Sequence, residues 1–518
     1  MTGGMVGFWE VLGGAVGAVY LLSAAMLALQ AVVHVVLLRA PAPASVPAPV
    51  PAPASEPALG AVGAGGPAGA EDRPEVVVQL PIYNEPAVVE RLLEAVARLD
   101  WPADRLTVQI LDDSTDDTPD RVARWLAARP DRPFRWVHLR RTHRTGFKAG
   151  ALQAGLEAVG DVPWVMIYDA DFVPGVGDLA YAMRHVRPDT AAVQLRWDHL
   201  NAEENGLTRV QALNLDAHFA VEQRGRQGLG VWNAFNGTAG LWRVEAMRAA
   251  GGWEGDTLAE DLDLSVRVQR AGWRVEYRDD YGVPAELPAD FAAYRAQQRR
   301  WTQGGAACLR KHVSTLPSVP SRRLRWHARA LLAASSIHLA VWGIAVSSVG
   351  LVALAGPPAS PHSPALPWIP AVLDGAAVLG ALLLLLIALY KTAANRRHGW
   401  RIGEGWAWFL PRMAALWLLG AGMAWWHVRA WMAGIRGTPA EFVRTPKRGG
   451  LVAPPPPRPA RSFGGWQEAL HVLYFAWGAY LGLVSGHWGL APFHLLLAAG
   501  YAWVAIGSSQ PNLRRARI

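Results

Sequence analysis

Short apolar runs alternate with amphipathic stretches between residues 72 and 325 of this chain. The runs are rich in β-branched side chains, which is typical of buried strands, whereas the stretches between them repeat their apolar residues at helical spacing. The predicted strands are Val76–Leu80, Thr107–Leu111, Trp164–Tyr168 and Ala192–Leu195, and the predicted helices are Pro86–Leu99, Pro119–Ala128 and Ala149–Ala158.

This alternation predicts an α/β domain whose mostly parallel sheet is covered by helices on both faces. In such sheets ligands bind beyond the carboxyl ends of the strands. Polar clusters that directly follow a predicted strand are therefore the first candidates for a functional site.

Long apolar segments flank the α/β region on both sides. Residues 8–38 exceed the roughly 20 residues that cross a bilayer, and a cleaved signal peptide would have a basic start and a shorter apolar core, so we expect a retained membrane helix. The predicted domains are this helix (1–39), an Ala/Pro-rich linker (40–71), the α/β domain (72–325), membrane and interfacial helices (326–510) and a basic tail (511–518).

The chain carries a net charge of +8, and its Lys and Arg residues gather beside the apolar segments. This distribution is typical of an inner (plasma) membrane protein whose basic loops stay in the cytoplasm. It argues against nucleic acid as a partner and predicts a multi-pass protein with a cytoplasmic α/β domain.

The segment 408–435 has basic residues beyond both ends and contains Pro411 and Arg412. We favour a helix that lies along the interface or dips in and returns, and a full crossing against the charge rule is the alternative. Five crossings would then remain, at 8–38, 327–355, 369–390, 467–484 and 487–507.

Asp169 and Asp171 follow the predicted strand at 164–168 directly. Closely spaced carboxylates repel one another, and a divalent cation compensates for this repulsion. Two hard oxygen ligands at this spacing favour Mg²⁺ or Mn²⁺, and a solvated acidic loop is the alternative. The single cysteine, Cys308, excludes an intrachain disulfide and a Cys-rich metal site.

Neither a GxxxxGK[ST] phosphate loop nor a Gly-rich dinucleotide motif follows the first predicted strand, which leads into Pro81–Glu85. A nucleotide bound at this sheet would be held by side chains and a metal, since Mg²⁺ commonly binds through one or two carboxylates and the substrate phosphates.

Two further clusters lie closer to the second apolar region. Glu260 and Asp261 would begin a helix, where the dipole alone accounts for carboxylates, and either one is a candidate general base. Gln297, Arg300 and Trp301 share one helical face, which brings an amide, a guanidinium and an indole together. A guanidinium binds diphosphate, and an indole offers an apolar platform for a sugar ring.

Together these clusters resemble the membrane-embedded, processive family 2 glycosyltransferases. LDDSTDD, DAD, AEDLD and QQRRW occur in the order that family uses, and QQRRW matches its Gln-x-x-Arg-Trp motif. LDDSTDDT, TGFKAGAL, FNGTAGLWR, EDLDLSVR and YRAQQRRW look like the cellulose synthase-like A branch, the glucomannan and mannan synthases. The similarity covers residues 72–310 and the stretch GTPAEFVRTPKRG at 437–449.

The resemblance implies a GT-A fold and a hexosyltransferase. Its donor would be a nucleotide-sugar, UDP-glucose or GDP-mannose, and the hexose would pass with inversion to a growing β-linked polysaccharide exported through the membrane helices. The resemblance also implies site roles: nucleotide contacts for Asp112 and Asp113, a further donor contact for Lys148, the Mg²⁺ or Mn²⁺ ligands Asp169 and Asp171, the base Asp261, and acceptor and diphosphate contacts for Gln297, Arg300 and Trp301.

One departure from the family pattern and two alternative functions accompany this interpretation. No cyclic-dinucleotide-binding domain follows the last apolar segment, so we expect no regulation by that route within this chain. The alternative activity is transfer of a single sugar to a membrane lipid, because enzymes of that kind share these motifs. A catalytically silent transporter or scaffold would predict decayed carboxylates, and every expected carboxylate is present.

Overall fold

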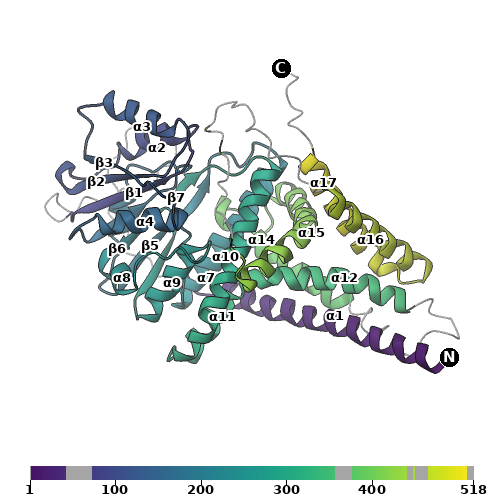
Figure 1. Cartoon of the computed structure of the whole chain (residues 1–518). Coiled ribbons are helices and arrows are strands. Elements are labelled where there is room, and N and C mark those ends of the chain that lie inside the picture. Colours follow the sequence, from purple (N-terminus) through teal and green to yellow (C-terminus); the bar gives the residue numbers. More distant parts are fainter. Residues whose placement is uncertain are drawn as a thin grey trace, which may run out of the picture.

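The structure is a computed structural model that describes residues 2–42, 73–355, 376–439, 447, 449 and 465–509. Most of the predicted linker at 40–71 and all of the predicted basic tail at 511–518 lie outside these residues. An α/β domain packs against a group of long helices, which extend away from it (Figure 1).

A seven-stranded sheet in the order β3-β2-β1-β4-β6-β5-β7 forms the centre of the α/β domain. Its strands β1 (Val76–Ile82), β2 (Leu106–Asp112), β4 (Trp164–Ile167) and β5 (Thr190–His199) confirm the four predicted strands. The short strand β6 (Gly240–Arg243) pairs antiparallel with β4 and β5, whereas the other pairings between described strands are parallel. The prediction of a mostly parallel sheet is therefore confirmed.

Three strands were not predicted, and each has a pattern that hides it. The edge strand β3 (Arg135–Arg140) is only half-buried and has Arg at both ends, so its residues resemble a polar loop. The strand β6 is only 4 residues long. The strand β7 (Arg274–Ala285) carries charged residues through its middle and has a bulge in its pairing with β5.

Helices cover both faces of the sheet, because neighbouring strand residues point to opposite sides. Val78 and Leu80 of β1 pack in one apolar cluster, whereas Val77 packs in another on the opposite face. The first cluster includes residues of α2 (Val89–Val96), α3 (Thr118–Ala127) and α5 (Asp178–Met183), and the second includes residues of α4 (Phe147–Glu157), α8 (Val244–Ala249) and α9 (Glu260–Arg270).

Helix α10 (Phe291–His312) joins the two halves of the molecule. It contacts α9 in the α/β domain and the long helix α15 (Trp406–Arg436), and it lies between the sheet and the extended helices (Figure 1). The other described α-helices are α1 (Thr2–Leu38), α6 (Gly206–Ala217), α7 (Arg224–Leu229), α11 (Arg322–Leu332), α12 (Ile337–Ala355), α14 (Ala376–His398), α16 (Gly465–Val484) and α17 (Ala491–Ser509), and a π-helical turn (His218–Gln223) connects α6 to α7.

Among the described residues, four helical segments are long and apolar enough to cross a membrane: Val11–Leu38, Ala334–Ala355, Trp406–Arg436 and Trp488–Ser508. The helices α1 and α12 run side by side, and α16 pairs with α17 (Figure 1). Apolar side chains on the outer faces, such as Leu22 of α1 and Leu473 of α16, are 67% exposed, which suits contact with lipid.

The segment predicted at 408–435 forms one unbroken helix, α15, of 31 residues. Pro411 lies inside this helix, in its second turn, where it removes one backbone hydrogen bond, and the helix continues through it. The length and composition of α15 are sufficient for a membrane crossing, which is the alternative stated above, and the re-entrant form stays a prediction. The interfacial form and the count of five crossings stay predictions.

Candidate functional site

A cavity opens beyond the carboxyl ends of β1, β2 and β4, at the edge where the alternating fold predicts a ligand site. Residues from the α/β domain, from α10 and from the chain after α15 line it together. The lining includes all but one of the predicted site residues: Asp113, Lys148, Asp169, Asp171, Asp261, Gln297, Arg300 and Trp301.

Asp169 and Asp171 follow β4 directly, and each faces a lysine. Lys148 Nζ lies 2.6 Å from Asp169 Oδ1, and Lys447 Nζ lies 2.5 Å from Asp171 Oδ2. Burial raises the pKa of the Asp169 carboxyl, while the Lys148 ammonium lowers it. Two carboxylates that line one cavity are the hard oxygen ligands that a divalent cation takes. These residues fit the predicted metal.

Glu260 and Asp261 begin α9 and both line the cavity. Glu260 is 7% exposed, whereas Asp261 is more open to the cavity. Burial raises the pKa of Asp261 to about 7, the negative charge of Glu260 adds to this effect, and Lys148 opposes it. A carboxylate with this pKa that is open to the cavity is suited to accept a proton near neutral pH, and the role of Asp261 as the base stays a prediction.

The turn Asn236–Gly237–Thr238 holds several of these groups in place. Lys148 Nζ donates to the Gly237 carbonyl at 2.9 Å, and the Asp169 backbone N–H donates to Thr238 Oγ1 at 2.8 Å. Gly237 has φ +87°, and a Cβ atom there would lie 2.9 Å from Asp261 Oδ2. Only glycine suits this backbone so close to a carboxylate. Reasoning from sequence assigned this turn no role.

The two predicted nucleotide contacts differ in their surroundings. Asp113 lines the cavity, and Arg141 donates to both of its oxygens at 2.9 and 2.5 Å. Asp112 is 1% exposed, accepts from Ser114 N–H at 2.8 Å and lies 2.8 Å from His138 Nε2. Burial raises the pKa of Asp112, but the His138 and Ser114 hydrogen bonds bring it below the ordinary value. The donor contact of Asp112 stays a prediction.

Gln297, Arg300 and Trp301 all reach the cavity from α10, as their shared helical face predicts. The Trp301 ring lies 6.4 Å from the Trp197 ring of β5, so two indoles stand on neighbouring sides of the cavity. The positive charge of Arg300, which lines the same cavity, opposes the rise in the pKa of Asp169. The helix thus places an amide, a cation and an apolar ring beside the acidic pair.

Lys447 is a cavity residue that reasoning from sequence missed. Besides its contact with Asp171, its Nζ donates to the Glu286 carbonyl at 2.7 Å, and Gly449 N–H donates to Glu286 Oε2 at 3.0 Å. The residue lies beyond α15, far along the chain from the sheet. Its only sequence signal was the family-like stretch GTPAEFVRTPKRG.

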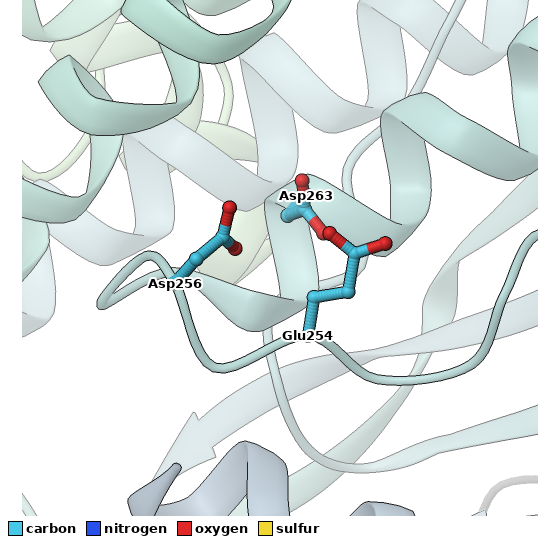
Figure 2. A group of neighbouring side chains, drawn as sticks. All are labelled: Glu254, Asp256 and Asp263. Carbon is cyan, nitrogen blue, oxygen red and sulfur yellow. The ribbon is translucent and has the colours of Figure 1, made fainter.

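A second acidic group, Glu254, Asp256 and Asp263, is not part of the cavity lining. Figure 2 shows these three side chains close together. Its carboxylates surround the Lys311 ammonium, whose Nζ lies 2.6 Å from Glu254, 2.8 Å from Asp256 and 2.9 Å from Asp263. A lysine therefore already supplies the cation. Because Asp263 belongs to α9 and Lys311 to α10, this cluster joins the two helices that carry the base and the Gln297–Trp301 face.

We expect Lys311→Met to lower the free energy of unfolding by about 1–3 kcal/mol, because three carboxylates lose a shared donor. The melting temperature of the purified protein should fall by several degrees. The control is Arg322→Met, which removes an exposed cation from α11. Equal melting temperatures for the two variants would contradict a bracing role for Lys311.

Comparison with known proteins agrees with this geometry. Residues 74–304 match the family described as Glycosyltransferase like family 2. The chain is 40% identical over 270 residues to glucomannan 4-beta-mannosyltransferase 2 of Arabidopsis thaliana, covering 50% of this chain and 49% of that protein. It is 43% identical over 243 residues to the probable glucomannan 4-beta-mannosyltransferase 9 of Oryza sativa subsp. japonica, covering 46% of each. The chain thus spans about half the length of the curated relatives it matches.

One solved structure resembles the larger part of the fold. It is described as mannosyltransferase PcManGT from Pyrobaculum calidifontis in complex with GDP-Man and Mn²⁺. The likeness has a TM-score of 0.50 at 20% identity and covers 83% of this chain and 100% of that one. The α/β domain therefore has the predicted GT-A-type fold. Residues 74–304 match the family 2 glycosyltransferase model, and about half of the chain is similar to the glucomannan 4-β-mannosyltransferases.

Proposed function

We propose that this protein is an inverting hexosyltransferase that extends a β-linked polysaccharide from a nucleotide-sugar donor. The observation that carries the proposal is the meeting of Asp261, the Asp169–Asp171 pair and the Gln297–Trp301 face in one cavity. A base, anion-binding cations and a sugar platform are the groups that this transfer needs.

In the proposed reaction Asp261 accepts the proton of an acceptor hydroxyl, whose oxygen forms a bond to the anomeric carbon of the donor sugar. The bond from that carbon to the diphosphate oxygen breaks, and the nucleoside diphosphate leaves. Arg300, Lys148 and Lys447 line the cavity and would stabilise the negative charge that develops on the diphosphate. Asp169 and Asp171 would hold Mg²⁺ or Mn²⁺, which when bound supplies further charge compensation at the same diphosphate.

We propose GDP-mannose as the principal donor and UDP-glucose as the second. The support is the name of the relatives, glucomannan 4-beta-mannosyltransferases, and the GDP-Man present in the similar solved structure. The four helical segments that could cross a membrane support a place in the inner (plasma) membrane, with the α/β domain in the cytoplasm, where nucleotide-sugars are made. Export of the glycan through the membrane helices belongs to the same proposal.

The donor and the acceptor class are tested with purified protein in lipid nanodiscs and Mn²⁺. GDP-mannose and UDP-glucose, each radiolabelled in the sugar, are offered separately and together, and the products are separated by size and by extraction into organic solvent. Label in a large, water-phase product supports a polysaccharide synthase. Label in a small, organic-soluble product would replace it with a lipid-directed transferase.

The raised pKa of Asp261 predicts a pH profile. A general base acts only when ionised, so kcat/KM should rise about tenfold per pH unit as the pH increases toward about 7, and should level off above it. Glu260→Gln removes the negative charge beside Asp261 and should move this rise to lower pH, because ionisation of Asp261 becomes easier. An unchanged midpoint in this variant would contradict the assignment of the titrating group to Asp261.

A further inference from the structure

A chain of polar side chains links the N-terminal membrane helix to the wall of the cavity. His34 Nε2 of α1 lies 3.1 Å from Glu222 Oε1, and the other oxygen of Glu222 lies 3.1 Å from His218 Nδ1. His218 Nε2 in turn lies 3.0 Å from the amide nitrogen of Asn236, which lines the cavity. His218 and Glu222 both belong to the π-helical turn, an irregularity that is frequent at functional sites.

The hydrogen-bond partners of each side chain show which nitrogen atoms in this polar network carry a proton. Gln223 donates to the Ala234 carbonyl at 2.6 Å and to Asn236 Oδ1 at 2.7 Å, so the Asn236 amide nitrogen points toward His218. An amide nitrogen only donates, so His218 Nε2 accepts and His218 Nδ1 carries the proton that it gives to Glu222. The hydrogen bonds thus run in one direction, from the cavity wall to the Glu222 carboxylate.

The partners of His34, at the α1 end of this polar network, are also defined. His34 Nδ1 lies 2.9 Å from the Gln30 carbonyl, which only accepts, and His34 Nε2 faces the Glu222 carboxylate. Both ring nitrogens of His34 therefore lie against acceptors, and the ring pairs with the Glu222 carboxylate. Burial raises the pKa of Glu222, but the His218 and His34 hydrogen bonds and the Arg226 guanidinium hold it well below its ordinary value.

The end of α1 is fitted closely to the element that follows the π-helical turn. A Cβ atom on Gly225 of α7 would lie 2.6 Å from the Leu37 carbonyl oxygen, and one on Gly228 would lie 2.0 Å from the Pro41 carbonyl oxygen. A larger side chain at either position would push the membrane helix away. Small residues of this kind mark close helix approach, so His34 is held beside Glu222 by backbone packing as well as by charge.

We propose that His34, Glu222 and His218 are positioning residues. They couple the position of the N-terminal membrane helix to the rigidity of the turn Asn236–Gly237–Thr238. Loss of the His34 donor leaves Glu222 with His218 and with Arg226, whose Nη2 is 3.5 Å away. The Glu222 carboxylate is then expected to move toward the Arg226 guanidinium. Because His218 donates to Glu222, its ring shifts as well and loses its hydrogen bond with the Asn236 amide. The turn loosens where it supports Lys148 and stands beside Asp261. The effect on turnover presupposes the hexosyl transfer proposed above.

The coupling is tested first without activity, by hydrogen exchange followed by mass spectrometry on the full chain in nanodiscs. In His34→Ala, peptides that cover Phe235–Thr238 should exchange about 10-fold faster than in the wild type, because a charged hydrogen bond is lost from the chain. His34→Gln keeps an N–H donor toward Glu222 and should restore most of the protection. Val32→Ala, a change on the same helix at a residue that is 54% exposed, should leave these peptides unchanged.

The second measurement is a double-mutant cycle on turnover, using variants of equal melting temperature. We expect His34→Ala to lower kcat about 10-fold with little change in donor KM, and to lower it less than about 2-fold when Asn236→Ala is already present. A merely structural loss would reduce kcat by the same factor in both backgrounds, and such additivity would overturn the coupling.

The outcomes separate the coupling from the proposed function. Unchanged exchange at 235–238 in His34→Ala overturns the coupling whatever the activity. Faster exchange in a protein whose wild type transfers no hexose would leave the coupling standing and would remove the proposed function.

Discussion

Replacing Asp261 with Asn is expected to lower kcat for hexose transfer about 100- to 10,000-fold, the range that a positioned general base supplies. The amide keeps the size of the carboxylate and can still accept the hydrogen bond that Leu262 N–H gives to Oδ1 at 2.8 Å. It does not take up a proton near neutral pH, so the acceptor hydroxyl loses its base. Donor KM should change little, and release of nucleoside diphosphate measures both parameters.

The matched control for this variant is Asp120→Asn, which makes the same chemical change at an exposed aspartate of α3. Its kcat should equal that of the wild type. A folded Asp261→Asn protein whose kcat stays within about tenfold of the wild type would show that another group takes the proton, and Glu260 would then be the first candidate.

The second large effect is expected when Asp169 and Asp171 are both replaced by Asn. The variant should lose the dependence of its rate on Mn²⁺ or Mg²⁺ concentration, and kcat/KM should fall about 100- to 1,000-fold, because charge stabilisation of the leaving diphosphate is lost. The measurements are initial rates across a metal titration and Mn²⁺ binding by equilibrium dialysis.

The control for the metal pair is the corresponding double substitution of Glu254 and Asp256 by Gln and Asn. These carboxylates belong to the group that already contains the Lys311 ammonium, so the metal titration should be unchanged. A metal response that disappears in this control and persists in the Asp169 and Asp171 variant would move the metal site out of the cavity.

The strands β2 and β4 and their acidic ends were predictable because their apolar side chains are uninterrupted or nearly so and the acidic residues begin abruptly. The edge strand β3 and the short β6 gave no such signal. Arginine residues stand at both ends of β3, and β6 begins with glycine and ends with arginine, so neither has an apolar run of the length of a typical strand. Periodicity therefore identified four buried strands and missed the two edge strands, β3 and β7, and the short inner strand β6.

The site was predictable in its parts but not in its contacts. Asp112 and Asp113 are adjacent and identical in type, yet Asp112 is the last residue of β2 and is buried, whereas Asp113 follows the strand and lines the cavity. Lys447 and the chain from His34 to Asn236 depend on segments that are far apart in sequence and meet only in the fold. No local pattern predicts such meetings.

The central claim is that one cavity builds a β-linked hexose polymer from a nucleotide-sugar. It is tested most directly by incubating the wild-type protein in lipid with sugar-labelled GDP-mannose and Mn²⁺, then treating the large product with an endo-β-mannanase. We expect labelled polymer that the enzyme degrades to short oligosaccharides, and none from Asp261→Asn. Absence of polymer, or polymer that resists the β-specific enzyme while GDP-mannose is consumed, would contradict this account.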